Sequence, residues 1–260
     1  MLRTPFDISK ARILVSNDDG IHAPGIKVLE EIARSLSDDV WVVAPEVEQS
    51  AMSHSLTIRH PLRIRKWEER RYAVDGTPTD CVLLAVQEIL KDKRPGIVLS
   101  GINRGGNLAE DVIYSGTVAA AMEAALLGIP AIAFSQVTPR NETPLWETPR
   151  RFAPDIIRKL VSMDWADEVL VNVNFPPIAA DKVSGVEVQP QGKRKVGLGI
   201  EGRPDPYGVP YYWIVDFASD APQRRDTDLS AIGAGAIAVT PLHLDFTHHP
   251  TLAGFRDLFA

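Results

Sequence analysis

Short runs of apolar residues, each bounded by turn-forming residues, recur along the first half of the chain. The runs at 13–15, 40–43, 97–99 and 131–134 have the length of buried strands. Between them, apolar positions recur every three or four residues, which is typical of helices with one buried face. The pattern therefore predicts strands and helices that alternate up to about residue 135.

Three of the predicted helices have recognisable starts. Pro24 opens the first, because a proline at the first helical position has no N–H to leave unpaired. Thr77-Pro78-Thr79-Asp80 combines a capping threonine, a proline and an acid in the first turn. Ser115-Gly116-Thr117 opens an alanine-rich helix that Gly128 and Pro130 close.

Strands that alternate with helices form parallel sheets covered by helices on both faces. In such sheets, ligands bind beyond the carboxyl ends of the strands. The polar segments that follow the runs 13–15, 40–43 and 97–99 all belong to that edge. We therefore expect an α/β fold, with its functional site at this edge.

Other elements are expected outside this repeating pattern. The even-numbered apolar residues Leu56, Ile58, Leu62 and Ile64 predict a strand with one buried face, which could pair with residues 72–74 as a hairpin. The second half predicts a helix and three strands, one of which pairs with an upstream segment; their ranges are 149–163, 169–173, 211–215 (the paired strand) and 236–240. Residues 1–11 are expected to be a short mobile extension, and the tail after residue 240 shows no clear period.

Composition and charge mainly exclude classes of partner and structure. The 260 residues carry a formal net charge of −6, so binding of a nucleic-acid polymer through a broad basic surface is not expected. No apolar run reaches the ~18 residues of a membrane span, and we expect a cytoplasmic protein that does not bind membranes. The single cysteine, Cys81, cannot form an internal disulfide and is expected to be buried.

Two adjacent acids, Asp18 and Asp19, end the first predicted strand. Their charges repel each other, and a hard divalent cation with oxygen ligands would neutralise both. The alternative is a turn closed by an Asx-type hydrogen bond, because Asn-Asp-Asp-Gly is also favourable turn chemistry. The pair alone leaves both interpretations open.

Two neutral residues follow the neighbouring strands. Ser50 comes after the second strand and Asn103 after the third, so each offers an oxygen at the same edge of the sheet. Two carboxylates with two neutral oxygens suit magnesium or manganese better than zinc.

The helix start at Ser115, Gly116 and Thr117 is a candidate phosphate site. Free backbone N–H groups and small hydroxyl residues at a helix N-terminus can bind phosphate. Ordinary capping explains the same residues, because serine and threonine cap many helices.

At these residues the chain resembles the SurE family of stationary-phase survival phosphatases. The resemblance covers nearly the whole chain and is densest in residues 12–135. It rests on Val15–Gly25, Asp75–Cys81, Ser100–Asn103, Asn107, Tyr114–Glu123, Thr227-Asp228 and Thr240–Leu242. The chain departs from the family at Ala51, where glycine is usual, and residues 136–235 match only in patches.

The resemblance implies a Rossmann-like core and a metal-dependent phosphomonoesterase that hydrolyses nucleoside 5′-monophosphates, with 3′-monophosphates and short polyphosphate as further candidate substrates. It implies one divalent cation per subunit, magnesium or manganese. The implied metal ligands are Asp18, Asp19, Ser50 and Asn103. Of these, Asp18, Asp19 and Asn103 are also the candidate catalytic residues. The implied phosphate contacts are Asn107, Ser115, Gly116 and Thr117.

The resemblance further implies a homodimer or homotetramer that exchanges C-terminal segments, with a β-rich C-terminal extension or hairpin used in assembly. We accordingly expect residues 1–135 to carry the metal and phosphate site. Residues 136–260 are expected to complete the core and to carry the oligomerisation segments.

Non-catalytic alternatives remain at this point. A magnesium-binding receiver domain also places paired acids after its first strand, but it needs an aspartate at the end of strand three, where this chain has Leu99-Ser100. A stress-linked oligomeric binding protein would make use of the long C-terminal half.

Several other residues allow both a structural and a functional interpretation. His22 and His54 are candidate proton donors or solvated loop residues, and Lys193-Arg194-Lys195 is a solvated loop or an arm that attracts anions. The tryptophans Trp146, Trp165 and Trp213 are expected to be packing residues, and Asp226 and Asp228 to be capping or interface residues.

Overall fold

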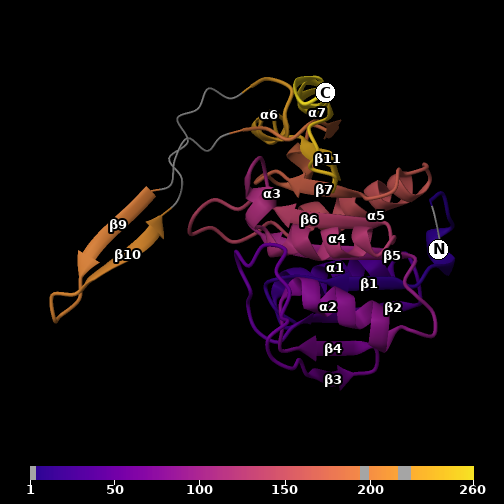
Figure 1. Ribbon diagram of the computed structural model, residues 1–260. Coiled ribbons are helices and arrows are strands. Elements are labelled where there is room, and N and C mark those ends of the chain that lie inside the picture. The colour runs from indigo at the N-terminus through magenta and orange to yellow at the C-terminus, as the bar shows by residue number, and fades with distance from the viewer. Residues whose placement is uncertain (1–3, 194–198, 216–223) are drawn as a thin grey trace.

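The computed structural model describes residues 4–193, 199–215 and 224–260 and contains a nine-stranded sheet and a separate two-stranded one (Figure 1). The strand order of the larger sheet is β3 (Ile64–Glu68), β4 (Arg71–Val74), β2 (Val40–Pro45), β1 (Ile13–Ser16), β5 (Ile97–Arg104), β6 (Ala131–Gln136), β7 (Val169–Phe175), β11 (Ile237–His243) and β8 (Val186–Val188). From β4 to β7 all neighbours are parallel, whereas β3 pairs antiparallel with β4 and β11 with β7. The expected α/β fold with a mostly parallel sheet is confirmed.

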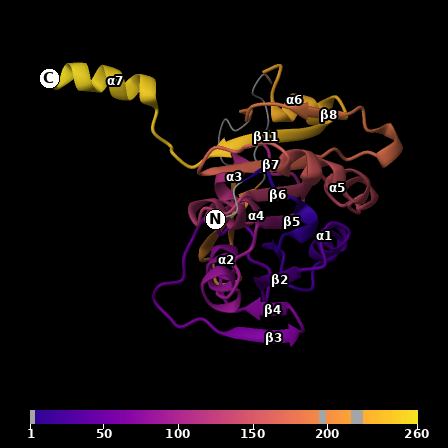
Figure 2. The same cartoon turned by 90° about the vertical axis from the view of Figure 1, so that its right-hand side faces the viewer.

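Helices cover both faces of this sheet (Figures 1 and 2). One apolar core lies on the face covered by α1 (Pro24–Arg34) and α5 (Glu147–Val161), and a second on the face covered by α2 (Pro78–Leu84) and α4 (Gly116–Leu126). The remaining helices are α3 (Asp111–Tyr114), α6 (Asp228–Gly233) and α7 (His249–Leu258), with a π-helical turn at Ala85–Ile89 and 3-10 turns at Ile8–Lys10 and Ala180–Lys182. Cys81 lies in the second core and is fully buried, as expected.

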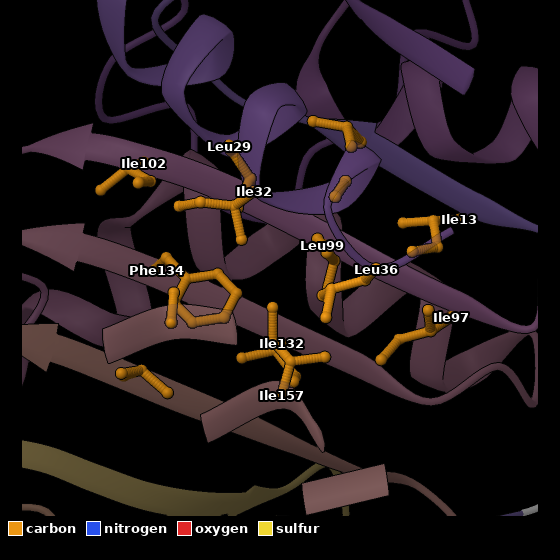
Figure 3. Packing of buried hydrophobic residues seen from close by; sticks show 14 of the residues in the cluster. Ile13, Leu29, Ile32, Leu36, Ile97, Leu99, Ile102, Ile132, Phe134 and Ile157 are labelled. Carbon is orange, nitrogen blue, oxygen red and sulfur yellow. The ribbon is translucent and has the colours of Figure 1, made fainter. Parts of the chain in front are cut away.

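The first core shows why the apolar pattern produces these layers (Figure 3). Leu29 and Ile32 lie on the inner face of α1, and Ile13, Leu99 and Phe134 project from the sheet toward that helix. Each such side chain contributes about 1.5–3 kcal/mol when it is fully removed from water. The helical period of α1 therefore fixes which of its faces lies on the sheet.

The start of α2 is stabilised by reciprocal capping. The N–H of Asp80 donates to the hydroxyl of Thr77 (3.1 Å), and the N–H of Thr77 donates to the Asp80 carboxylate (2.9 Å). The other carboxylate oxygen of Asp80 accepts the N–H of Thr57 (3.0 Å), and the Thr77 hydroxyl donates to the carbonyl of Ser55 (2.7 Å). The helix start thus also holds the chain near residues 55–57.

These hydrogen bonds explain why the strand expected from Leu56 to Ile64 is wrong over most of its length. Strand β3 begins only at Ile64, and the side chain of Ile58 is 83% exposed. The backbone near residue 57 pairs with α2 side chains instead of with a strand. Strand β3 itself is the outermost strand, and all of its residues are exposed, although its predicted hairpin with β4 is confirmed.

Three other expectations need correction. Strand β5 continues through Asn103 to Arg104 instead of ending at Leu99, with an irregular register against β6 between Ser100 and Asn103. The described part of the N-terminal segment is packed: Ile8 is buried, and the N–H of Phe6 donates to the carbonyl of Val161 (3.2 Å). The tail, which showed no period, forms α7.

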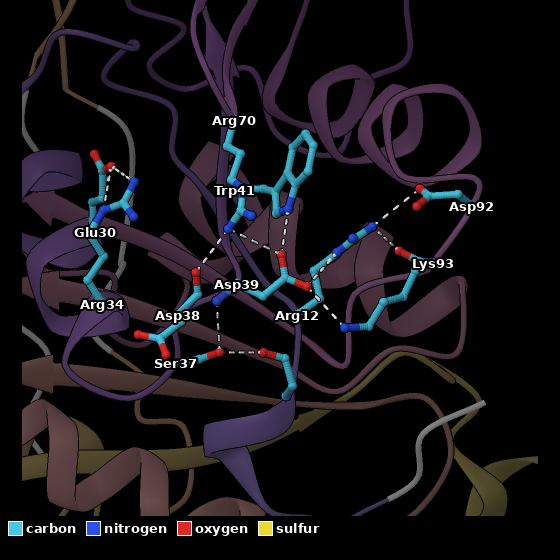
Figure 4. A network of polar contacts seen from close by, with 11 residues as sticks. Arg12, Glu30, Arg34, Ser37, Asp38, Asp39, Trp41, Arg70, Asp92 and Lys93 are labelled. Atoms are coloured by element: carbon cyan, nitrogen blue, oxygen red, sulfur yellow. Dashed lines mark hydrogen bonds and ion pairs between the residues drawn. The ribbon is translucent and has the colours of Figure 1, made fainter.

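A polar network joins the amino ends of three parallel strands (Figure 4). Arg12 precedes β1, Asp39 precedes β2 and Lys93 precedes β5; both cations lie 3.0 Å from the carboxylate of Asp39. The indole N–H of Trp41 donates to the same carboxylate (2.8 Å). Burial alone would raise the pKa of Asp39, but hydrogen bonds from Lys93, Trp41 and Arg12 outweigh it and lower that pKa to about 2.

The two-stranded sheet is a hairpin of β9 (Gly199–Pro204) and β10 (Pro210–Val215), which projects away from the larger sheet (Figure 1). The expected pairing of residues 211–215 with an upstream strand is confirmed. Trp213, expected to be a packing residue, is 61% exposed on this hairpin, whereas Trp146 and Trp165 pack against the first core. No helix among the described residues is long and apolar enough to cross a membrane.

Candidate functional site

A cavity of about 1190 Å³ lies at the carboxyl edge of the parallel strands. Six residues predicted from the sequence line it together: Asp18, Asp19, Ser50, Asn103, Asn107 and Ser115. They come from the chain after β1, the chain after β2, the end of β5, the loop that follows β5 and the start of α4. The structure therefore brings together residues up to about a hundred positions apart, as the strand order requires.

Asp18 is buried and is held by the first turn of α4. Its carboxylate accepts the hydroxyl and the backbone N–H of Thr117. Gly116 leaves the space for this contact, because a Cβ there would lie 2.7 Å from the Cβ of Asp18. Burial, together with the negative charge of Asp19, raises the pKa of Asp18 to about 6 despite the hydrogen bonds from Thr117.

Asp19 is half-buried and less firmly held. Its carboxylate accepts the backbone N–H of Arg104 at 3.4 Å. Burial is the main cause that raises its pKa, and the carboxylate of Glu48 adds to that effect, whereas Arg104 opposes it. Among the described residues, no lysine, arginine or histidine forms an ion pair with either acid, although Arg104 is near enough to lower the pKa of Asp19.

The two neutral candidates differ in their present partners. The hydroxyl of Ser50 donates to the carboxylate of Glu48 (2.7 Å). The side-chain amide nitrogen of Asn103 donates to the carbonyl of Gly105 (3.0 Å), so its oxygen is the atom that can serve as a ligand. Glu48 also lines the cavity, and sequence reasoning missed it because a lone acid in a polar loop carries no pattern.

This donor set fits a hard divalent cation. In the part of the chain that the structure describes, no three histidine, cysteine, aspartate or glutamate side chains form a metal-binding group, which disfavours a zinc site. Two carboxylates that burial and neighbouring negative charges disfavour as free anions, with hydroxyl and amide oxygens beside them, are the environment that magnesium or manganese prefers.

Asn107 is fixed by residues that the sequence reasoning overlooked. Its backbone N–H donates to the side-chain oxygen of Asn174 (2.9 Å), and its side-chain nitrogen donates to the hydroxyl of Ser135 (2.8 Å). The side-chain amides of Asn172 and Asn174 both donate to its carbonyl (2.8 and 3.1 Å). Two buried asparagines that alternate with valines in β7 were the signal that could have indicated this network.

The three residues at the start of α4 play different parts. Ser115 lines the cavity and caps the helix, its hydroxyl oxygen accepting the N–H of Val118 (3.0 Å). Gly116 and Thr117 do not line the cavity, and they surround Asp18 instead. Phosphate contacts from these two residues stay predictions.

The two histidines considered as proton donors lie elsewhere. His54 pairs with Glu123 (3.0 Å), and the ring of His22 packs edge-on against Trp67 with 4.9 Å between ring centroids. Neither histidine is among the described residues that line the cavity.

The lining of the cavity also contains larger and partly apolar side chains. They include Arg104, Tyr114, Pro144 and Trp146, and Ile214 from the β9–β10 hairpin. Of the basic run at 193–195, only Lys193 lies within the described residues.

Known proteins resemble this chain over nearly its whole length. Residues 13–197 match the family described as "Survival protein SurE". The chain is 58% identical over 253 residues to the "5′-nucleotidase SurE" of Paramagnetospirillum magneticum, with 97% of each chain covered. It is 55% identical over 251 residues to the protein of the same name from Parvibaculum lavamentivorans, covering 95% of this chain and 90% of that one.

A solved structure agrees with the fold. The crystal structure of the SurE protein from Aquifex aeolicus matches with a TM-score of 0.84 at 41% identity, covering 95% of this chain and 99% of that chain.

Proposed function

Because this chain belongs to the survival protein SurE family, we propose that it is a metal-dependent phosphatase that hydrolyses nucleoside 5′-monophosphates to nucleoside and phosphate. One structural observation carries this proposal: Asp18 is buried beside Asp19 in a cavity at the edge of the sheet where ligands bind. Among the described residues, no lysine, arginine or histidine side chain forms an ion pair with either acid. The relatives' name, 5′-nucleotidase, supports the substrate class and does not favour the non-catalytic alternatives. Activity on 3′-monophosphates and short polyphosphate, and a cytoplasmic location, stay predictions.

The metal would be held by Asp18, Asp19, Ser50 and Asn103, one divalent cation per subunit, magnesium or manganese. When bound, it would supply Lewis-acid chemistry, offsetting the charge of the phosphate and making water more acidic. The pKa of Asp18, raised to about 6 without a cation, supports this assignment because bound positive charge would favour the ionised form of the acid.

The chain's own groups would then position the phosphate. The hydroxyl oxygen of Ser115 already accepts one N–H, so its hydrogen is left to donate to a phosphate oxygen. The side-chain nitrogen of Asn107 has a second hydrogen beyond the one donated to Ser135. Asp18 is the candidate to orient or deprotonate water or to attack phosphorus directly, and Arg104 adds positive charge to the cavity wall.

The test is turnover of AMP and of p-nitrophenyl phosphate by protein treated with EDTA and then given manganese or magnesium. Asp18→Asn should lower kcat by ~100-fold or more with saturating metal, because a charged group at the reacting phosphate is lost. The variant should unfold no more easily than wild type when metal-free, since an acid whose ionised form is disfavoured has been neutralised. Asp155→Asn, an exposed change on α5, is the control. Near wild-type turnover of the Asp18 variant would refute the assignment.

We also propose that the chain forms a homodimer or homotetramer that exchanges C-terminal segments. Helix α7 extends away from the body of the molecule (Figure 2), and none of its residues is buried. Phe259, just after this helix, is 85% exposed, and Phe246, just before it, is also exposed. Apolar side chains on an extended terminal segment are the feature expected of an element that packs on a second copy.

A further inference from the structure

The loop between β5 and α3, residues 105–110, carries Asn107 and is tied to the C-terminal half of the chain. Ala109, also in this loop, is fully buried and has a φ of +50°, a backbone conformation that residues other than glycine rarely adopt. Its N–H donates to the carboxylate of Asp228 (2.8 Å), and its carbonyl accepts the side-chain amide of Gln191 (2.6 Å). Both polar groups of this strained residue are therefore held by residues more than eighty positions away.

Asp228 is the centre of this arrangement. It is fully buried at the first position of α6, and one of its oxygens is used by Ala109. The other oxygen accepts the N–H groups of Gly192 (2.8 Å) and Leu229 (2.7 Å). Across the described residues, no salt bridge reaches this carboxylate, so its charge is stabilised by backbone N–H groups.

The contacts of Asp228 go beyond those of a helix cap. Thr227 already caps α6, its hydroxyl oxygen accepting the N–H of Ser230, so the helix start does not need Asp228 for that purpose. Gly192 fits closely, since a Cβ there would lie 2.8 Å from Asp228 Oδ1. Leu229 packs with Leu108 and Ala109 in a small apolar cluster beneath the loop.

We propose that Asp228 is a positioning residue for phosphate hydrolysis: its buried carboxylate fixes the loop 105–110 and thereby places Asn107 and the adjoining Asn103 around the cavity. This inference rests on the proposed function. The same carboxylate holds Gly192, which begins the stretch leading to the β9–β10 hairpin, whose Ile214 lines the cavity. Asp228 thus joins the loop 105–110 to the segment at Gly192.

The test compares Asp228→Asn with Asp226→Asn, the same chemical change at an exposed neighbour. Asparagine keeps the size of Asp228 but replaces an acceptor oxygen with an N–H donor, which would face a backbone N–H. We expect kcat for AMP and for p-nitrophenyl phosphate to fall by ~10- to 100-fold in Asp228→Asn, with little change in KM, because misplaced groups act in the transition state. The amide hydrogens of residues 105–111 should exchange faster, whereas those of β1 and β6 should not.

If Asp228→Asn does not fold, Gln191→Met removes the second tie to Ala109 without touching the buried charge, and it should show the same changes to a smaller degree. Unchanged turnover in a folded Asp228 variant, or exchange that rises equally in the whole sheet, would overturn the proposal. Absence of hydrolysis by the wild-type protein would instead refute the proposed function, and faster exchange confined to the loop would still support the structural part of this inference.

Discussion

At the scale of single residues, Thr117 directs its hydroxyl and its backbone N–H at the carboxylate of Asp18. The N-terminus of α4 carries a partial positive charge, which also favours the ionised acid. Gly116 completes the arrangement, because any side chain there would collide with Asp18. These groups offset part of the cost of burying the acid, and in the proposed function a bound metal would offset the rest.

Replacing Thr117 by valine should therefore weaken metal binding. Valine has the same shape but no hydroxyl, and loss of one hydrogen bond to a charged group costs about 1.5–3 kcal/mol, roughly a 10- to 100-fold effect. The midpoint of manganese activation should shift to higher concentration by about that factor. Thr117→Ser retains the hydroxyl and should stay near wild type; equal midpoints for the two variants would contradict the role assigned to the hydroxyl.

The residues that could be predicted from the sequence are those whose chemistry is local. Asp18 and Asp19 adjoin each other, and Thr77 lies three positions from its capping partner. Asn174 and Asp228 could not be placed, because their contacts with the loop 105–110 span 67 and 119 positions and depend on how the strands are ordered. Glu48 was missed because a lone acid in a polar loop carries no pattern.

At the scale of elements, the two ends of the parallel strands have different roles. The carboxyl ends of β1, β2 and β5 lead into the cavity, whereas their amino ends are joined through Asp39 (Figure 4). We call these contacts of Asp39 with Arg12 and Lys93 the Asp39 clamp. Arg12 also donates to the carbonyl of Lys93 (2.7 Å), so the clamp includes main chain as well as side chains. A change at this end should affect stability and leave chemistry alone.

Asp39→Asn tests that separation. The folded pKa of Asp39 is about 2, below its ordinary value of 3.8, so its stabilising effect is present above about pH 4 and is lost as pH falls through 2. The variant should lose on the order of 1 kcal/mol of unfolding free energy at neutral pH, allowing for solvent screening. Urea unfolding at a series of pH values should show the difference from wild type vanishing toward pH 2, and manganese-dependent turnover should be unchanged. A difference that does not vary with pH would contradict the electrostatic origin.

Elements with strong local signals were predictable, whereas elements whose structure depends on what packs against them were not. The four apolar runs became β1, β2, β5 and β6 because each is buried on both faces. The alternation around Ile58 resembled a strand, but the chain there bonds to the start of α2 instead of to a neighbouring strand. Helix α7 lacked a clear apolar period because none of its residues is buried within its own chain.

At the scale of the whole molecule, two apolar surfaces formed by the described residues are uncovered in a single chain. Tyr212, Trp213 and Ile214 are exposed on the β9–β10 hairpin, and Phe246 and Phe259 flank α7. Patches of this kind on a folded chain mark contacts with other chains. The proposed exchange of C-terminal segments would cover the second surface.

A chain that ends at Asp245 should therefore assemble less than the full chain. Strand β11 ends at His243, so the nine-stranded sheet and its circular dichroism should be preserved. Light scattering should give a dimer or tetramer for the full chain and a smaller species for the shortened one. Asp257→Ala, at an exposed polar position of α7, should leave assembly unchanged. A full chain that is already monomeric would rule out the exchange.

The clamp around Asp39 has a consequence for protein engineering. Many enzymes trade stability for activity because the strained residues that carry the reaction also weaken the fold. Here the Asp39 clamp occupies the rim of the sheet opposite the paired acids. Heat-tolerant variants could therefore be selected by mutating the chain around Arg12, Asp39 and Lys93, with little of the usual penalty in turnover.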